Sequence, residues 1–182
     1  MDRDAERILL KRCREGEPSA FEGLVRDSID SLYRVAYRFT DSASETEDMV
    51  QEAFFRAYKA LGRFQGESSF RTWVTRILIN VCKDYLARRK TRSTVELDEQ
   101  TAHIPAAAES PLDGAVRMEM RGKIGAAFRR LPVEEKEVAV LILVDGQSYS
   151  QAAKTLGESA GTVAWRLFEA RKKMSEWLKE YR

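Results

Sequence analysis

Residues 44–92 read SETEDMVQEAFFRAYKALGRFQGESSFRTWVTRILINVCKDYLARRKTR, and apolar side chains recur at helical spacing in two segments of this stretch. In the first segment, Ser44 and Glu47 have the spacing of a capping box, which predicts that a helix begins there. The apolar face of this helix is predicted to contain Met49, Val50, Ala53, Phe54, Ala57, Tyr58 and Leu61. Its opposite face presents three polar residues side by side, Asp48, Gln51 and Glu52.

The second segment follows a loop over 62–67, in which two glycines bracket an aromatic and two polar residues. Ser68 or Ser69 is predicted to cap the helix that follows. Its buried face should be Phe70, Trp73, Val74, Ile77, Leu78, Val81 and Tyr85. Its opposite face should be Arg71, Thr75, Arg76, Asn80, Lys83 and Asp84. An acidic helix followed by a basic helix that bears an asparagine indicates two different partners for one small domain.

The composition favours an all-α fold, because glycine and proline are scarce in the 182 residues and good helix formers are plentiful. Two helices are expected before residue 44, one over 4–15 with Ile8 and Leu9 on its apolar side and one capped by Ser19. We predict two small helical domains, 1–92 and 114–182. The segment 93–113 lacks sustained periodicity and is predicted to be an acidic, flexible linker.

The C-terminal part has the pattern of a helix-turn-helix. Helices are expected over 112–130 and from Pro132 to an end at Asp145 and Gly146. Ser148 and Gln151 then form a capping box for a short helix, Gly157 turns the chain, and Ser159 caps a long helix that runs to about residue 181. A short helix, a turn with glycine and a longer helix are typical of DNA-binding proteins.

The formal net charge is only +2, but the charges are unevenly distributed. Basic residues dominate the segment 63–92, and acidic residues dominate 93–119. The basic segment 63–92 therefore indicates a polyanionic partner. Cys13 and Cys82 form no C-x-x-C pair, and the chain has no apolar run that would serve as a signal peptide or membrane span. We therefore expect a cytoplasmic protein that is not inserted in a membrane.

No catalytic constellation is visible in the sequence. The single histidine, His103, lies in the expected linker, and zinc would require several clustered ligands. A glycine-rich phosphate loop of the usual spacing is also missing. We therefore expect a protein that is not an enzyme and that uses no cofactor and no metal.

Three segments resemble the sigma factors of bacterial RNA polymerase, in particular the short extracytoplasmic-function type. EDMVQEAFFRAYKAL at 47–61 resembles the core-binding helix of region 2, and RFQGESSFRTWVTRILINVCKDYLARR at 63–89 resembles its −10 element loop and helix. LPVEEKEVAVLILVDGQSYSQAAKTLGESAGTVAWRLFEARKKM at 131–174 resembles region 4 along its whole length. The resemblance implies three partners: core RNA polymerase, through its β′ clamp helices and β flap, promoter DNA, and an anti-sigma protein.

The resemblance also implies roles for particular residues. Contacts to the β′ clamp helices would come from Asp48, Gln51 and Glu52, which from their spacing alone are equally compatible with a solvated helix face. Contacts to the −10 element would come from Arg63, Phe64, Gln65, Ser68, Arg71, Arg76, Asn80, Lys83 and Arg88. Of these, Phe64 is expected to be poorly explained by packing, and Asn80 is the expected reader of a base edge.

Contacts to the −35 element would come from Ser159, Thr162, Trp165, Arg166, Glu169, Lys172 and Lys173. The sequence departs from the family pattern at Ala164 and Trp165, where a basic residue and a serine are usual, and at Glu169, where arginine is common. Two alternatives remain at this stage, a plain helix-turn-helix regulator and a helical adaptor that binds only protein. The acidic helix beside the basic 63–92 segment favours the sigma factor over both.

Overall fold

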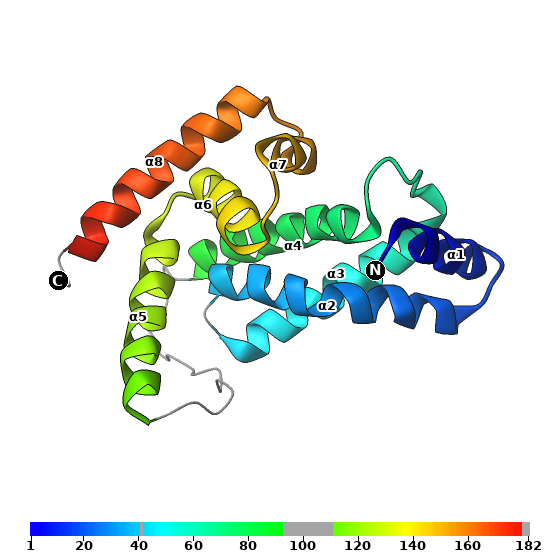
Figure 1. Ribbon diagram of the computed structural model, residues 1–182, viewed down its shortest axis with the longest axis horizontal. Helices are drawn as coiled ribbons and strands as arrows, with labels where there is room; N and C mark the ends of the chain where they lie inside the picture. Colours follow the sequence, from blue (N-terminus) through cyan, green and yellow to red (C-terminus); the bar gives the residue numbers. More distant parts are fainter. Residues whose placement is uncertain (41, 93–110, 180–182) are drawn as a thin grey trace. The chain divides into compact units, whose positions relative to one another are not determined.

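The computed structural model describes residues 1–40, 42–92 and 111–179, and all regular structure within these ranges is helical (Figure 1). The chain divides into two compact units. The first is built on α1 (Arg3–Arg14), α2 (Pro18–Thr40), α3 (Ala43–Ala60), the 3₁₀ turn η1 (Leu61–Arg63) and α4 (Phe70–Arg92). The second is built on α5 (Pro111–Arg130), α6 (Val133–Ala139), the π-helical turn η2 (Val140–Val144), α7 (Tyr149–Leu156) and α8 (Ala160–Lys179).

The predicted linker lies almost entirely outside the described residues, as do His103 and the expected end of the last helix. Residues 111–113, which we assigned to the linker, already belong to α5. The all-α fold class is confirmed.

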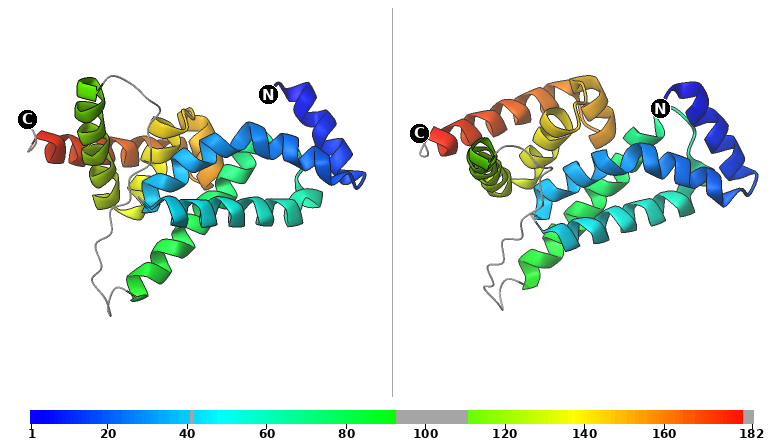
Figure 2. Two further views of the ribbon diagram at one scale, coloured as in Figure 1. Left: turned by 90° about the horizontal axis from the view of Figure 1, so that it is seen from below. Right: turned by 60° about the horizontal axis from the view of Figure 1, so that its bottom comes forward.

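The first unit has its core between α2, α3 and α4. Helices α2 and α3 lie side by side in both views of Figure 2. Phe21 of α2 makes edge-to-face contacts with Tyr58 of α3 and Phe70 of α4, with ring centroids 5.1 and 5.9 Å apart. The large side chains that are fully buried in this core include Leu24, Leu32, Val35, Val50, Phe70, Val74 and Leu78. Most of the predicted apolar faces of α3 and α4 are therefore confirmed.

Three residues of α1, α3 and α4 lie on a different side of their helix from the one predicted. Ile8 of α1 and Tyr58 of α3 were expected to face inward, and both are exposed. Thr75 was expected on the outer face of α4 and is fully buried, together with Ile79 and Cys82. Helix α4 is thus covered on more than one side, and a single apolar stripe does not describe it.

Helix caps account for several of the element boundaries. Ser148 and Gln151 form the predicted capping box, and the hydroxyls of Ser69 and Ser159 accept from the N–H groups of Thr72 and Thr162 at 3.1 and 3.0 Å. Gly157 ends α7 with a φ of 72°, a left-handed conformation that favours glycine.

Other predicted caps are wrong by one or two residues. Helix α2 begins at Pro18 and α3 at Ala43, so Ser19 and Ser44 lie inside helices. Proline is well suited to the first turn, which explains the earlier start of α2. Pro132 is the N-cap residue of α6 and not its first helical residue.

The second unit packs α6 and α7 against α8. Its core consists of Val138, Val140, Leu141, Ala152, Val163, Leu167 and Ala170. The turn before α7 is fixed by a buried hydrogen bond, in which the Thr155 hydroxyl donates to Oε1 of Gln147 at 2.9 Å. These contacts hold α7, Gly157 and α8 as a helix-turn-helix, as the sequence predicts.

Thr75→Val is expected to stabilise the first unit by about 1 kcal/mol. The Thr75 hydroxyl is buried without a hydrogen-bond partner, and valine has a similar shape without the cost of burying that group. Hydrogen exchange of the α4 amides would measure the change. Thr155→Val is the matched control and should destabilise the second unit by about 1–2 kcal/mol, because it leaves Gln147 without its donor. Lower protection of α4 in the Thr75 variant would contradict the prediction.

Candidate functional site

The outward face of α3 presents the three polar residues predicted from the sequence. Asp48 and Gln51 are exposed and Glu52 is half-buried, while the neighbouring Met49 and Val50 face the core. The Gln51 amide donates to Oε1 of Glu47 at 3.3 Å. This face is therefore a polar, acidic surface supported by an apolar one, which is the arrangement required for a docking surface on a rigid element.

The same face contains an aromatic residue that the sequence analysis missed. Phe55 is one turn beyond Gln51, and 54% of it is exposed. The Lys59 ammonium lies 4.0 Å from its ring centroid. The signal was present in the sequence, because Phe54 fits the buried stripe and the next residue of a helix is rotated by about 100° away from it. Aromatic side chains are enriched in protein interfaces, so an exposed phenylalanine on this face indicates a protein contact.

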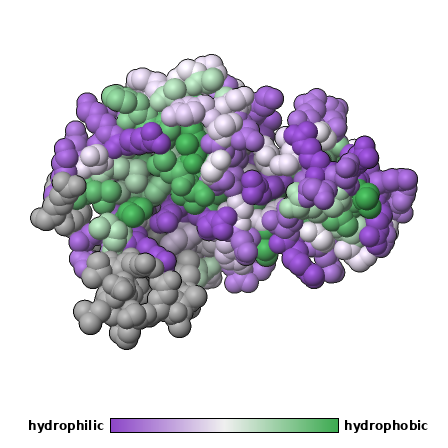
Figure 3. All heavy atoms as spheres, viewed as in Figure 1, coloured by the Kyte–Doolittle hydropathy of each residue, from purple (hydrophilic) through white to green (hydrophobic). Residues whose placement is uncertain are grey.

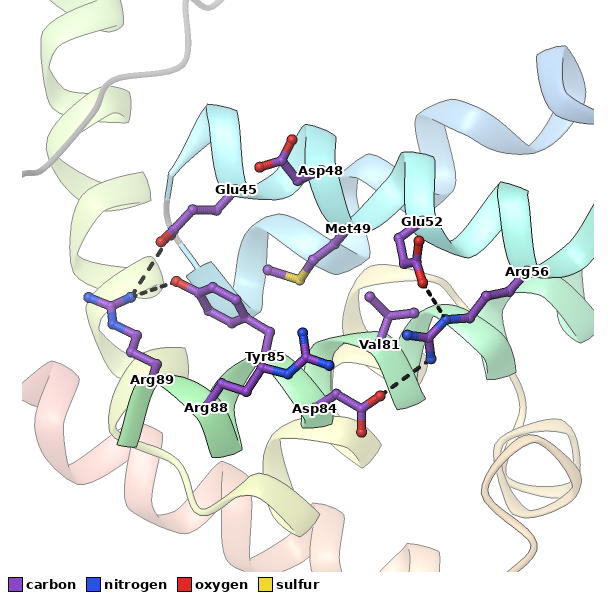
Figure 4. Close-up of a pocket in the computed structure, with 10 residues that line it drawn as sticks. All are labelled: Glu45, Asp48, Met49, Glu52, Arg56, Val81, Asp84, Tyr85, Arg88 and Arg89. Carbon is purple, nitrogen blue, oxygen red and sulfur yellow. Dashed lines mark hydrogen bonds and ion pairs between the residues drawn. The ribbon is translucent and has the colours of Figure 1, made fainter. Parts of the chain in front are cut away.

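An open groove of about 600 Å³ lies between α3 and α4 (Figure 4). Asp48 and Glu52 line it from α3, and Asp84 and Arg88 line it from α4. Arg56 bridges the two helices, because its Nε donates to Glu52 at 2.7 Å and its Nη1 donates to Asp84 at 3.3 Å. Arg88, which we predicted as a contact to the −10 element, thus shares a groove with the acidic face of α3.

The far end of this groove is closed by a second set of contacts. Nη1 of Arg89 lies 4.0 Å from Oε2 of Glu45 and donates to the Tyr85 hydroxyl at 3.2 Å (Figure 4). Burial raises the pKa of Tyr85 to about 12, and the carboxylate of Glu45 acts in the same direction. The phenol is therefore neutral at physiological pH and serves as a hydrogen-bonding wall of the groove.

The loop before α4 has both exposed and buried parts. Arg63 and Gln65 are exposed and Ser68 is half-buried, so these predicted contact residues are accessible. Phe64 is only 4% exposed, and its ring centroid lies 4.8 Å from that of Trp73. The expectation that packing would not explain Phe64 is therefore wrong, because its ring belongs to the core of the first unit.

The predicted DNA-binding residues of α4 do not share one face. Arg76, Asn80 and Lys83 are exposed and follow one another at i, i+4 and i+7, which places them on one stripe. Arg71 lies in the first turn, away from this stripe, and Arg88 lies in the groove. The structure thus brings together three of the predicted residues as a compact basic stripe with one amide.

Helix α8 presents two exposed aromatics on its outer side. Trp165 and Phe168 are 62% and 64% exposed, and Lys172 follows them on the same stripe. Phe168 is absent from the predicted set, although its spacing from Trp165 would have shown it. Ser159 is exposed at the N-cap, and Thr162 and Glu169 are half-buried on this helix.

Two of the predicted bases on α8 have partners within the second unit. Nη1 of Arg166 lies 3.2 Å from Oε1 of Glu158, in the turn before the helix. Lys173 donates to the largely buried Glu135 of α6. Lys173 therefore supports the packing of α6 on α8, and Arg166 is held beside the turn before α8. Of the three predicted basic residues, Lys172 is the exposed one.

Within the described ranges, no three His, Cys, Asp or Glu side chains are grouped so that they could hold a metal ion. In the same ranges no helix combines the length and the apolar character that crossing a membrane would require. Cys13 is half-buried and Cys82 is buried, and the two cysteines are not joined in a disulfide.

Comparison with known protein families gives two matches. Residues 24–92 match the family Sigma-70 region 2, and residues 121–174 match the family Sigma-70, region 4. The chain is 31% identical to the RNA polymerase sigma-H factor of Pseudomonas aeruginosa, over 98% of this chain and 96% of that protein. It is 32% identical to the ECF RNA polymerase sigma-E factor of Escherichia coli, over 91% of this chain and 90% of that protein.

Solved structures show the same similarity. CnrH, in complex with the cytosolic domain of CnrY, superposes with a TM-score of 0.74 and 30% identity, over 97% of this chain and 99% of CnrH. The sigma factor RpoE of Bartonella quintana, in complex with the anti-sigma factor NepR, superposes with a TM-score of 0.70, over 89% of this chain and 98% of RpoE. Its identity of 23% supports the shared fold.

Proposed function

The chain belongs to the sigma-70 family of RNA polymerase sigma factors, in its extracytoplasmic-function group, and from this premise we propose which surfaces bind its partners. Its function is to direct core polymerase to specific promoters and to initiate transcription there. We propose that it acts by binding alone, without covalent chemistry, in the cytoplasm where polymerase and DNA are found. We propose its division into region 2, linker and region 4 at the boundaries 1–92, 93–113 and 114–182, although α5 begins at Pro111, within the last three residues of that linker.

The proposed surface for core polymerase is the outward face of α3. Asp48 and Gln51 are exposed there, Glu52 stands beside them, and Phe55 adds an apolar anchor one turn away. Carboxylates and an amide suit an arginine-rich coiled coil such as the β′ clamp helices. Aromatic anchors in the centre of polar contacts commonly dominate the energy of an interface.

The proposed surface for the −10 element is the stripe Arg76, Asn80 and Lys83, together with the exposed loop residues Arg63 and Gln65. Arginine and lysine suit phosphate oxygens, and the Asn80 amide can pair with an adenine edge through two hydrogen bonds. Arg71, Ser68 and Arg88 are proposed as secondary contacts around this stripe. Phe64 is proposed to act through packing beneath the loop, because its ring is buried.

The second unit is proposed to bind the −35 element through α8 and the polymerase β flap through an apolar groove. The groove has a volume of about 380 Å³ and is lined by Leu143, Arg171, Met174, Ser175, Leu178 and Lys179. Figure 3 shows apolar side chains gathered where α6 and α8 come together. A concave apolar surface of this kind suits an amphipathic helix of a partner.

We also propose that an anti-sigma protein holds this factor inactive. CnrH, which is similar to nearly the whole of this chain, was solved in complex with the cytosolic domain of CnrY. The Bartonella quintana RpoE, which shares the fold, was solved in complex with the anti-sigma factor NepR. An anti-sigma protein that covers the α3 face and the apolar groove of the second unit would block polymerase at both sites.

The observation that supports the proposal most strongly is the presence of two different surfaces on one small unit. The acidic and aromatic face of α3 suits a protein, and the basic stripe of α4 suits DNA. The test is run-off transcription from a genomic library with core polymerase, with and without the purified chain. Specific transcripts that require the chain are expected. Tight sequence-specific DNA binding by the free chain, with no transcripts, would favour a plain helix-turn-helix regulator.

Glu169→Arg is expected to raise the general DNA affinity of the holoenzyme and to relax its preference at the −35 element. The Glu169 carboxylate repels phosphate, but it can accept a hydrogen bond from a cytosine amino group. Arginine at this position would lose the contact to cytosine and would add attraction to the DNA backbone. One added phosphate contact should steepen the dependence of log K on log salt by about 0.9. Binding to a randomised −35 library at two salt concentrations would measure both effects. Glu176→Arg, two turns nearer the C-terminus, is the matched control, and equal behaviour of the two variants would contradict the prediction.

A further inference from the structure

Helix α1 makes a hydrogen bond to each end of the loop 64–69, which connects η1 to α4. Oε1 of Glu6 accepts from the N–H of Phe70, the first residue of α4, at 3.0 Å. The Arg14 guanidinium donates to the carbonyl oxygen of Phe64, where the loop begins. Because a helix rises about 1.5 Å per residue, Glu6 and Arg14 lie about 12 Å apart along the axis of α1. One helix therefore holds both ends of the loop.

The middle of the loop is separated from α1 by a cavity of about 540 Å³. Residues of α1 line one side of this cavity, and Gln65, Gly66 and Ser68 line the other. Gln65 and Gly66 are exposed, and Gly66 has a φ of 76°, in the left-handed region that favours glycine. Because the cavity keeps the middle of the loop from packing on α1, the course of the loop depends on how its two ends are held.

The contact from Glu6 completes the N-terminus of α4. The N–H of Phe70 is one of the first four of this helix, which have no acceptor within the helix. The Ser69 hydroxyl accepts from the N–H of Thr72 at 3.1 Å, and the half-buried Glu6 provides the acceptor for Phe70. A carboxylate is also favoured at the positive end of a helix. The start of α4 therefore depends on a residue of α1 as well as on its own serine.

The contact from Arg14 fixes the other end of the loop at its backbone. The ring of Phe64 is buried, and its centroid lies 4.8 Å from that of Trp73 and 6.4 Å from that of Phe70. Helix α4 thus holds the side chain of Phe64, and Arg14 holds its carbonyl group. Together they fix the orientation of the peptide that leads to the exposed Gln65.

Helix α1 is itself fixed by packing. Leu10 is buried, and the half-buried Leu9 lies against Gly23 of α2. A Cβ atom at Gly23 would lie 2.9 Å from Cδ1 of Leu9, so the glycine permits this close approach. Helix α1 is therefore a fixed support from which Glu6 and Arg14 reach the loop.

We propose that Glu6 and Arg14 are positioning residues for recognition of the −10 element. They hold the loop so that the exposed Arg63 and Gln65 are already placed for promoter DNA. A loop that is ordered before binding loses less conformational entropy when it binds, so the affinity depends on both contacts. The inference rests on the proposed function, in which Arg63 and Gln65 belong to the −10 surface.

The test is binding of holoenzyme to two DNAs, with Glu6→Ala and Arg14→Ala introduced singly and together. One DNA has an opened −10 region, and the other is a duplex that contains only the −35 element. The double variant should bind the opened −10 DNA at least about tenfold more weakly, because the loop must then be ordered during binding. Its affinities for the −35 duplex and for core polymerase should be unchanged, since neither residue lies on those proposed surfaces.

The opposite charges of the two residues separate positioning from a direct electrostatic effect on DNA. If charge alone acted, Glu6→Ala would strengthen binding and Arg14→Ala would weaken it. Positioning predicts that both substitutions weaken binding and leave its salt dependence unchanged. A lost phosphate contact on a single strand would instead reduce the salt slope by about 0.7.

Conservative variants test whether the hydrogen bonds themselves are required. Glu6→Gln keeps an oxygen acceptor for the N–H of Phe70, and Arg14→Lys keeps a donor for the carbonyl group of Phe64. Both variants should bind the opened −10 DNA within about threefold of the wild type. Should the double alanine variant fail to bind core polymerase, the single and conservative variants provide the same test.

Glu15→Ala and Arg12→Ala are the matched controls, because they remove the same charges from residues near the end of α1 that do not line the cavity. Glu15 lies 3.7 Å from Lys11, and Arg12 pairs with Glu17. Wild-type affinity of the double variant for the opened −10 DNA, or an equal loss in the controls, would overturn the inference. Stronger binding by Glu6→Ala would overturn it as well. Wild-type holoenzyme that binds neither DNA would instead overturn the proposed function.

Discussion

Replacing Asp48 and Gln51 together by alanine is expected to weaken the binding of core RNA polymerase about 30- to 1,000-fold, which corresponds to about 2–4 kcal/mol. Both side chains are exposed on α3, and the residues behind them are buried in the core. Their removal would leave the bases of the β′ clamp helices unpaired in a desolvated interface, which costs more than the loss of one exposed ion pair. Titration of labelled core polymerase with the variant measures the change.

Asp30→Ala on α2 is the matched control, because it removes one exposed carboxylate from another helix of the same unit. Its affinity for core polymerase should stay within about twofold of the wild type. Glu52→Ala should have a smaller effect than the double variant, since Glu52 already pairs with Arg56. If the double variant bound core polymerase as tightly as the control, the assignment of the α3 face would be excluded.

The helices themselves could be predicted because their apolar periodicity is strong. Caps were predicted correctly where nothing competed with the serine, as at Ser148 and Ser159. At Ser19 the preceding proline already starts the helix. At Ser44 the turn is set further upstream, where the Thr40 hydroxyl accepts from the N–H of Ser42 at 3.0 Å. A capping residue in the sequence shows that a helix begins nearby, and the competing residues decide where.

The errors on Thr75 and Phe64 have a tertiary origin. Periodicity assigns one buried face to a helix, but α4 is covered on more than one side. Thr75, on the face predicted to be exposed, is therefore buried. Phe64 lies in a loop, where no period indicates the direction of a side chain, and its burial depends on Phe70 and Trp73 of the next helix. Neither outcome follows from local sequence.

In the candidate sites, too, some features follow from helical periodicity and others depend on the packing of distant segments. The exposure of Asp48 and Gln51 follows from the helical period, and so would that of Phe55 and Phe168. The groove between α3 and α4 depends on the packing of two helices, as do the ion pairs of Arg56. The contacts of α1 with Phe64 and Phe70 join distant parts of the chain, so the cavity beside the loop became visible only in the structure.

Arg166→Ala is expected to lower the affinity of the holoenzyme for the −35 element about 5- to 150-fold, or by about 1–3 kcal/mol. Arg166 lies on α8 two turns after its N-terminus, the part of a recognition helix that meets base edges. Glu158 lies 3.2 Å from the Arg166 guanidinium and can orient it toward the major groove of the DNA. Arg166→Lys keeps the charge without the bidentate geometry, so its affinity should fall between those of the wild type and the alanine variant.

The measurement is binding of holoenzyme to −35 duplexes in which one base pair at a time is changed. Arg166→Ala should lose discrimination at one position, because a base contact is removed and the phosphate contacts remain. Glu158→Gln separates this role from a purely structural one. If Arg166 only braces the turn through Glu158, the two variants should behave alike. If it reads DNA, Glu158→Gln should retain discrimination, because the guanidinium remains available, and only Arg166→Ala should lose it.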